Sequence, residues 1–128
     1  MNLAEAFALY GAEGPRRTQR LSAVARDGAI ILGCSARRFS RPAAGVLRYE
    51  DVLSGDGGAL EAQRKLRQHL ELARAGSLPV RLIVITENGT AGAPASRTIH
   101  VRQDLVGSVV DLDAERYVVD FIKAIKPD

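Results

Sequence analysis

The stretch Arg48-Tyr49-Glu50-Asp51 contains the residue types of this sequence that could do chemistry together. In an extended strand, side chains alternate between faces, so Tyr49 and Asp51 would share one face and Arg48 and Glu50 the other. The neighbours of Asp51 on its face are apolar, and a carboxylate there is costly unless it has a partner. One interpretation is a pocket in which Tyr49 stacks on a planar ligand and Asp51 accepts a hydrogen bond, for example from the N4 amine of cytosine. The other is an exposed strand end, or a pairing of Asp51 with an arginine or a helix N-terminus.

Arginines gather in the first part of the chain. The segment 15–48 holds eight arginines and a single acid, Asp27. Because a planar guanidinium matches the geometry of phosphates and guanine edges, such a basic field suits a polyanion. The alternative is ordinary solvated charge, since fifteen of the eighteen basic residues of the chain are arginine. In a nucleic-acid interface we expect contacts from Arg16, Arg17, Arg20, Arg37, Arg38, Arg41 and Arg48.

The sequence supplies little for a metal site or for covalent catalysis. Its two histidines, His69 and His100, and its one cysteine, Cys34, form no ligand motif such as Cys-x-x-Cys. No Walker lysine, dinucleotide fingerprint or Gly-x-Ser-x-Gly elbow occurs. We therefore expect no metal and no cofactor, with His69 solvated and His100 exposed or half-buried. A small enzyme that uses Asp51, Glu50 and His100 around a cleft remains an alternative.

The elements that must position these residues begin with a short helix and a hairpin. Asn2 can cap a helix that ends at Gly11. Asp27-Gly28 is typical of a two-residue type I′ turn, in which both residues have positive φ. The pairs that this turn predicts on the core face of the hairpin are Ala25–Ile30, Ala23–Leu32 and Leu21–Cys34.

The rest of the sequence indicates further strands and one long helix. The C-terminal residues fit either a strand over 117–121 or a helix behind Asp113, and the adjacent valines favour the strand. The expected fold is α+β: a mostly antiparallel, curved sheet or partial β-barrel, with one main helix packed on it and a short N-terminal helix. The expected ranges are a loop over 40–45, strands over 45–53, 80–86, 97–102 and 106–112, and a helix over 59–75.

Length and composition fit a single domain over residues 1–128. With 46% hydrophobic and 26% charged residues, the chain does not have the composition of a disordered protein. No apolar run reaches the ~20 residues that span a bilayer, so we expect no membrane association. One cysteine cannot form an internal disulfide, which favours a cytoplasmic location.

The basic hairpin, the mixed β architecture and the motif Tyr49-Glu50-Asp51 resemble a reader domain of the SRA/PUA-like superfamily. Those domains bind nucleic acid, and the SRA members flip a modified base into a pocket. The resemblance covers well under half of the chain. It implies Tyr49 and Asp51 as base-pocket residues, and Phe39 could serve as the second aromatic that sandwiches a base.

These observations favour a non-catalytic nucleic-acid-binding module, such as the reader domain of a modification-dependent restriction-type protein. Its expected partner is DNA, modified or not, or RNA. A second hypothesis is a protein-interaction subunit, such as an immunity or adaptor protein, whose basic face binds an acidic protein. The two hypotheses differ in whether the chain binds nucleic acid with steep salt dependence.

Overall fold

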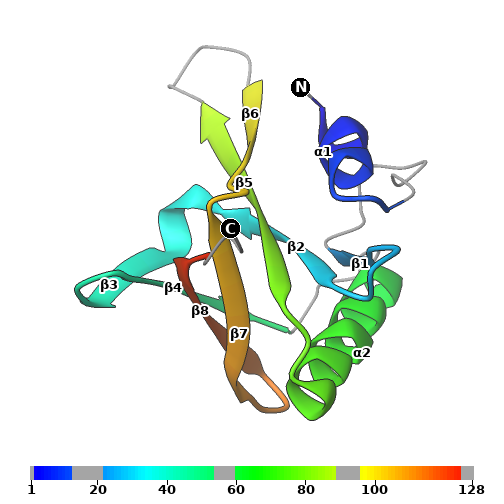
Figure 1. Ribbon diagram of the computed structural model, residues 1–128, viewed down its shortest axis with the longest axis vertical. Coiled ribbons are helices and arrows are strands. Elements are labelled where there is room, and N and C mark those ends of the chain that lie inside the picture. The colour runs from blue at the N-terminus through cyan, green and yellow to red at the C-terminus, as the bar shows by residue number, and fades with distance from the viewer. Residues whose placement is uncertain (1, 13–21, 54–59, 89–95, 125–128) are drawn as a thin grey trace.

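The computed structural model describes residues 2–12, 22–53, 60–88 and 96–124, which form helices and strands in an α+β arrangement (Figure 1). One curved, mixed sheet carries a long helix on one face and a short helix on the other. The expected fold class is confirmed. The elements are α1 (Leu3–Leu9), β1 (Ser22–Val24), β2 (Ile30–Ser35), the 3-10 turn η1 (Ala36–Arg38), β3 (Phe39–Ala43), β4 (Val46–Val52), α2 (Leu60–Gly76), β5 (Val80–Asn88), β6 (Ser96–Val101), β7 (Leu105–Leu112) and β8 (Arg116–Lys123).

The sheet is largely antiparallel and is not closed into a barrel. Its strand order is β1-β2-β5-β7-β8-β4-β3, and β6 pairs with β5. The pair β2–β5 is parallel and therefore needs a crossover connection, which contains the β3–β4 hairpin and α2. No described helix has the length and apolar character needed to cross a membrane.

Two hydrophobic clusters lie on opposite faces of the central strands β2 and β5. Ile30 and Leu32 of β2 belong to the cluster that includes α2, whereas Ile31 belongs to the cluster that includes α1. In β5 the same alternation places Leu82 in the α2 cluster and Ile83 in the α1 cluster. Because β5 packs against a cluster on each face, its sequence lacks the alternation of a strand with one solvent-exposed face.

The β1–β2 hairpin forms, but the predicted register is wrong by one residue. Ala23 lies opposite Ile31 instead of Leu32. The amide of Ala25 donates to the carbonyl of Ala29 at 2.8 Å, which closes a three-residue loop in which Gly28 has φ +90°. A single glycine in the left-handed region suits a three-residue hairpin loop, whereas the predicted type I′ turn needs two such residues.

Two further expectations from the sequence are confirmed and one is wrong. Asn2 caps α1 with a reciprocal capping box, and the C-terminal segment is the strand β8 instead of a helix. The expected loop over 40–45 is wrong, because residues 39–43 form the edge strand β3. Pro42 is tolerated there because an edge strand does not need every amide for pairing.

Gly107 of β7 provides the space that Phe121 of β8 occupies. The two residues lie opposite each other in the register, and Phe121 is fully buried. A Cβ atom at Gly107 would lie 2.6 Å from Cε1 of that ring, closer than real carbon atoms approach.

We therefore expect Gly107→Ala to lower the free energy of unfolding by about 2 kcal/mol, because the buried ring cannot move without displacing its neighbours. Urea denaturation followed by circular dichroism measures the change. Ser108→Ala, at the adjacent exposed position, is the matched control and should leave stability nearly unchanged. Equal stability of the two variants would contradict this packing.

Candidate nucleic-acid interface

Tyr49 lies where two distant strands of the curved sheet come together. Its hydroxyl accepts the backbone N–H of Ser35, at the end of β2, at 3.1 Å. The same hydroxyl donates to Oδ2 of Asp51 at 2.5 Å. In the sheet order β5, β7 and β8 lie between β2 and β4. The Tyr49 hydroxyl therefore joins two strands that do not pair with each other.

The second oxygen of Asp51 is also occupied. Oδ1 accepts the backbone N–H of Val52 at 2.8 Å and lies 3.3 Å from Nε of Arg38. The side chain of Asp51 is 23% exposed and that of Arg38 is 52% exposed. This arrangement agrees with the interpretation in which Asp51 pairs with a neighbouring arginine. Because the pair is partly solvated, its contribution to stability is small.

The ring of Tyr49 packs between two other aromatic rings. Its centroid lies 5.1 Å from that of Phe39 and 6.0 Å from that of Tyr117. Tyr49 is 1% exposed, whereas Phe39 is partly exposed. Stacking on a flipped base needs an accessible ring face. The base-pocket role of Phe39, Tyr49 and Asp51 stays a prediction, and the burial of Tyr49 does not favour it.

Burial also raises the pKa values of Tyr49 and of its neighbours Tyr117 and Cys34. Desolvation, the neighbouring Cys34 and the hydrogen bond to Asp51 raise the pKa of Tyr49. Desolvation is also the main cause that raises the pKa of Tyr117 and of the Cys34 thiol. Groups held in their neutral forms are poor nucleophiles. The observed contacts of Tyr49, Tyr117 and Cys34 are those of core packing, together with the link from Tyr49 to Ser35.

The arginines predicted for the interface have different surroundings. Arg37 and Arg41 are exposed, and neither forms an ion pair or a side-chain hydrogen bond within the described part of the chain. Arg38 pairs with Asp51. Arg16, Arg17 and Arg20 lie outside the described residues.

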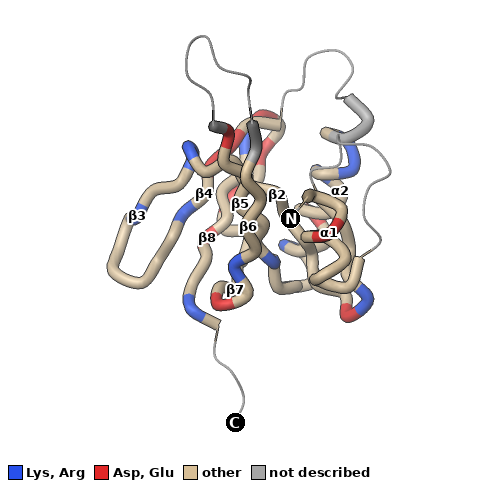
Figure 2. Tube along the Cα trace, turned by 90° about the horizontal axis from the view of Figure 1, so that it is seen from above, with Lys and Arg blue, Asp and Glu red and all other residues tan. Residues whose placement is uncertain are grey.

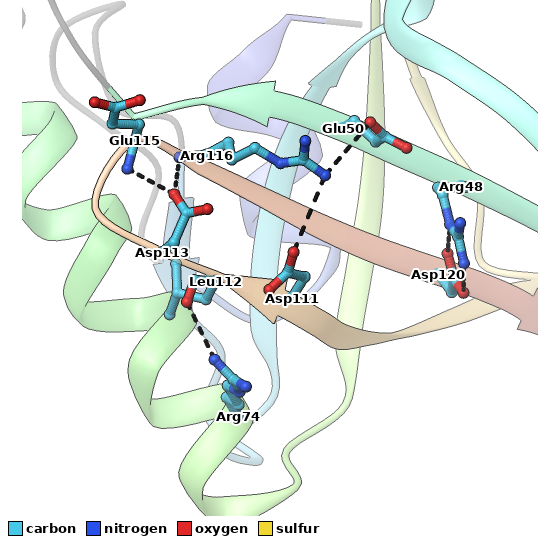
Figure 3. A network of polar contacts seen from close by, with 9 residues as sticks. All are labelled: Arg48, Glu50, Arg74, Asp111, Leu112, Asp113, Glu115, Arg116 and Asp120. Carbon is cyan, nitrogen blue, oxygen red and sulfur yellow. Dashed lines mark hydrogen bonds and ion pairs between the residues drawn. The ribbon is translucent and has the colours of Figure 1, made fainter.

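Arg48 lies on the outer face of the sheet and is bound to an acid (Figure 3). Its Nε and Nη2 donate to the two carboxylate oxygens of Asp120 at 2.7 and 2.9 Å. This hydrogen bonding raises the pKa of Arg48. On the same face, Arg116 lies 4.0 Å from both Glu50 and Asp111. The charge of Arg48 is thus offset by a neighbour, unlike those of Arg37 and Arg41.

The residues of the hypothetical enzyme are not brought together. Glu50 lies on the outer face opposite Val118, whereas Asp51 lies on the inner side with Tyr49. His100 is exposed on β6, as expected, and no contact found in the described residues joins it to either acid. The described residues contain no cluster of three His, Cys, Asp or Glu side chains suited to a metal ion.

His69 is not merely solvated, as the sequence suggested. Its Nδ1 lies 2.6 Å from Oγ of Ser22, a residue that is 1% exposed. The contact satisfies a buried hydroxyl between α2 and β1, which is a structural role.

A cleft of about 280 Å³ opens beside the β3–β4 hairpin. Arg102 is bound to Asp104 through two hydrogen bonds of 2.9 Å, and Arg41 has no acidic partner in the described residues. Lys123 forms no ion pair there, but its charge adds to the hydrogen bond from Arg102 in lowering the pKa of Asp104. Figure 2 shows basic positions in β3 and near the end of β8 on the same side of the molecule. The lining residues are Arg41, Gly45, Leu47, Arg102, Asp104, Leu105, Phe121 and Lys123.

The sequence indicates Arg41 as a candidate, but it does not indicate Arg102 or Lys123, the other cations of this cleft. One available signal was alternation, because Lys123 continues the inward series Tyr117, Val119 and Phe121. A lysine at the end of a core-facing series marks where the core gives way to solvent. Nothing in the sequence places Arg102 beside it, since that contact depends on the path of β7.

Comparison of the chain with protein-family models, with curated proteins and with solved structures finds no match. The resemblance to SRA/PUA-like readers therefore stays a prediction that rests on Tyr49-Glu50-Asp51 and the arginines.

We expect Tyr49→Phe to lower the free energy of unfolding by about 1–3 kcal/mol, because the Ser35 amide loses its acceptor and Asp51 its donor. Tyr10→Phe is the matched control, since it removes one bond, to the carbonyl of Leu82 at 2.9 Å. Urea denaturation of both variants measures the difference. If the Tyr49→Phe and Tyr10→Phe proteins were equally stable, the hydrogen bonds of Tyr49 to Ser35 and Asp51 would add no stability beyond that of a single bond.

Proposed function

We propose that this protein is a non-catalytic module that binds nucleic acid through its backbone phosphates. The binding surface is the basic edge, defined as Arg37, Arg38 and Arg41 of η1 and β3 together with Lys123 at the end of β8. The observation that carries the proposal is the unequal charge pairing of the two sides of the sheet. Acids pair with the arginines of the outer face, whereas three of the four cations of the basic edge form no ion pair in the described residues.

Exposed cations that form no ion pair are suited to binding phosphates for two reasons. Exposed guanidinium groups can donate two parallel hydrogen bonds to a phosphate without first breaking an internal ion pair. Each phosphate that a cation neutralises also releases condensed counterions, which favours binding at low salt. Arg37 and Arg41 meet the first condition, whereas Arg48 would have to leave Asp120.

The proposal includes neither base flipping nor catalysis. Tyr49 is 1% exposed and its hydroxyl is already bonded on both sides. Phosphate contacts position a protein on nucleic acid but carry no direct sequence information. We therefore expect binding with little sequence preference.

Fluorescence anisotropy with a short labelled duplex, at about 50 and 200 mM salt, tests the proposal. We expect affinity to fall steeply with salt, with a log–log slope of about −0.9 for each phosphate contacted. The double variant Arg37→Ala/Arg41→Ala should weaken binding at least about tenfold and flatten that slope by about two.

The matched control is Arg48→Ala/Arg116→Ala, which removes the same formal charge from the outer face. It should retain most of the affinity. Equal weakening by the two double variants would show that net charge, and not the basic edge, drives binding. Absence of binding at low salt would contradict the proposal and favour the acidic protein partner.

A further inference from the structure

We propose that the cleft beside the β3–β4 hairpin binds a terminal phosphate monoester, the phosphorylated end of a nucleic-acid strand. This inference rests on the proposed function and specifies which part of the strand occupies the cleft. Three features of the lining carry it: the size of the cleft, its unpaired cations and its apolar floor.

The cleft is small and has one apolar side. Its volume of about 280 Å³ is at the lower limit of the ~300–1,000 Å³ usual for small-molecule sites. Leu47 and Leu105 are partly exposed and provide apolar surface, and Phe121 lies fully buried beneath them. Gly45 lines the mouth with φ +77°, and a Cβ atom there would meet no atom within 4 Å. The space suits one phosphate with its sugar, and not a run of nucleotides.

The charge of the lining matches a dianion. Arg102 and Asp104 neutralise each other through their paired hydrogen bonds. Arg41 and Lys123 add two further positive charges, so the lining has a net charge of +2, although the charge of Lys123 also acts on Asp104. A phosphate monoester carries about −1.5 to −2 at pH 7, whereas an internal phosphodiester carries a single negative charge. The cleft therefore favours the end of a strand over its interior.

The position of the cations agrees with this ligand. Arg41 approaches from the edge strand β3 and Lys123 from the end of β8, so they reach the cleft from different strands. Lys123 lies opposite Leu105, and Phe121 lies opposite Leu47. A phosphate between the two cations would thus keep its attached sugar over the apolar floor. Arg37, which also belongs to the basic edge and forms no ion pair in the described residues, is then available for the following phosphate.

The test compares a short single-stranded oligonucleotide carrying a phosphate at one end with the same oligonucleotide ending in a hydroxyl. We expect the phosphorylated strand to bind about tenfold more tightly. Lys123→Ala and Arg41→Ala should each remove most of that preference. Lys65→Ala, which removes the same charge from α2 outside the cleft, should keep it.

Asp104→Asn tests the same charge balance in the opposite direction. Its carboxylate oxygens bind Arg102. The amide keeps the shape of the side chain but no longer neutralises Arg102, so the net charge of the lining rises by one. We expect the preference for the phosphorylated strand to rise severalfold. A gain of affinity cannot result from misfolding, which separates this variant from the alanine substitutions.

The outcomes distinguish the two proposals. If both strands bind equally well and Lys123→Ala weakens both alike, the cleft does not select a strand end, although the basic edge still binds nucleic acid. If neither strand binds, the proposed function fails as well. Binding of a nucleoside monophosphate without a preference between the two strands would place a free nucleotide in the cleft and overturn the strand-end assignment.

Discussion

The shape of the sheet beside the proposed binding surface depends on the hydroxyl of Tyr49. A curved sheet with free edges needs contacts other than the strand ladder to fix how far it curls. Tyr49 provides one by accepting the amide of Ser35 and donating to Asp51. Because η1 follows Ser35 directly, this contact also fixes where the segment carrying Arg37 and Arg41 leaves the sheet. A buried tyrosine in a sequence motif thus positions a surface that it does not itself form.

The charged residues on the two sides of the sheet differ in whether they form ion pairs. On the outer face, Arg48 is bound to Asp120 directly across the strand pair. Val118, between Glu50 and Asp111 in the register, is 4% exposed, so the charged residues of this face surround a buried apolar side chain. At the basic edge, Arg37, Arg41 and Lys123 form no ion pair in the described residues. An ion pair already formed is a poor phosphate ligand, because the acid must be displaced before the phosphate can bind.

Local signals in the sequence predict most of the elements, and tertiary contacts decide the rest. The alternation around Tyr117–Phe121 and the apolar run of β5 are period-two patterns that identify strands without further information. The dipeptide Asp27-Gly28 fits a two-residue or a three-residue loop. The three-residue loop sets Ala23 opposite Ile31, and both residues belong to the α1 cluster. The edge strand β3 was missed because its proline and the following glycine are typical of loops.

The candidate site was predictable only in part, for the same reason. The sequence identified the arginines as candidates, but pairing across strands determines which of them remain unpaired. The partners of Arg38 and Arg48 come from β4 and β8, and the opposition of Arg48 to Asp120 depends on a register that the sequence does not specify. The central claim is that nucleic acid binds on the side where such partners are missing. Titrating an oligonucleotide into labelled protein, while following backbone amide NMR signals, tests it most directly. The account predicts shifts confined to residues 37–45, 102–105 and 121–123, and shifts centred on Arg48, Arg116 and Asp120 would contradict it.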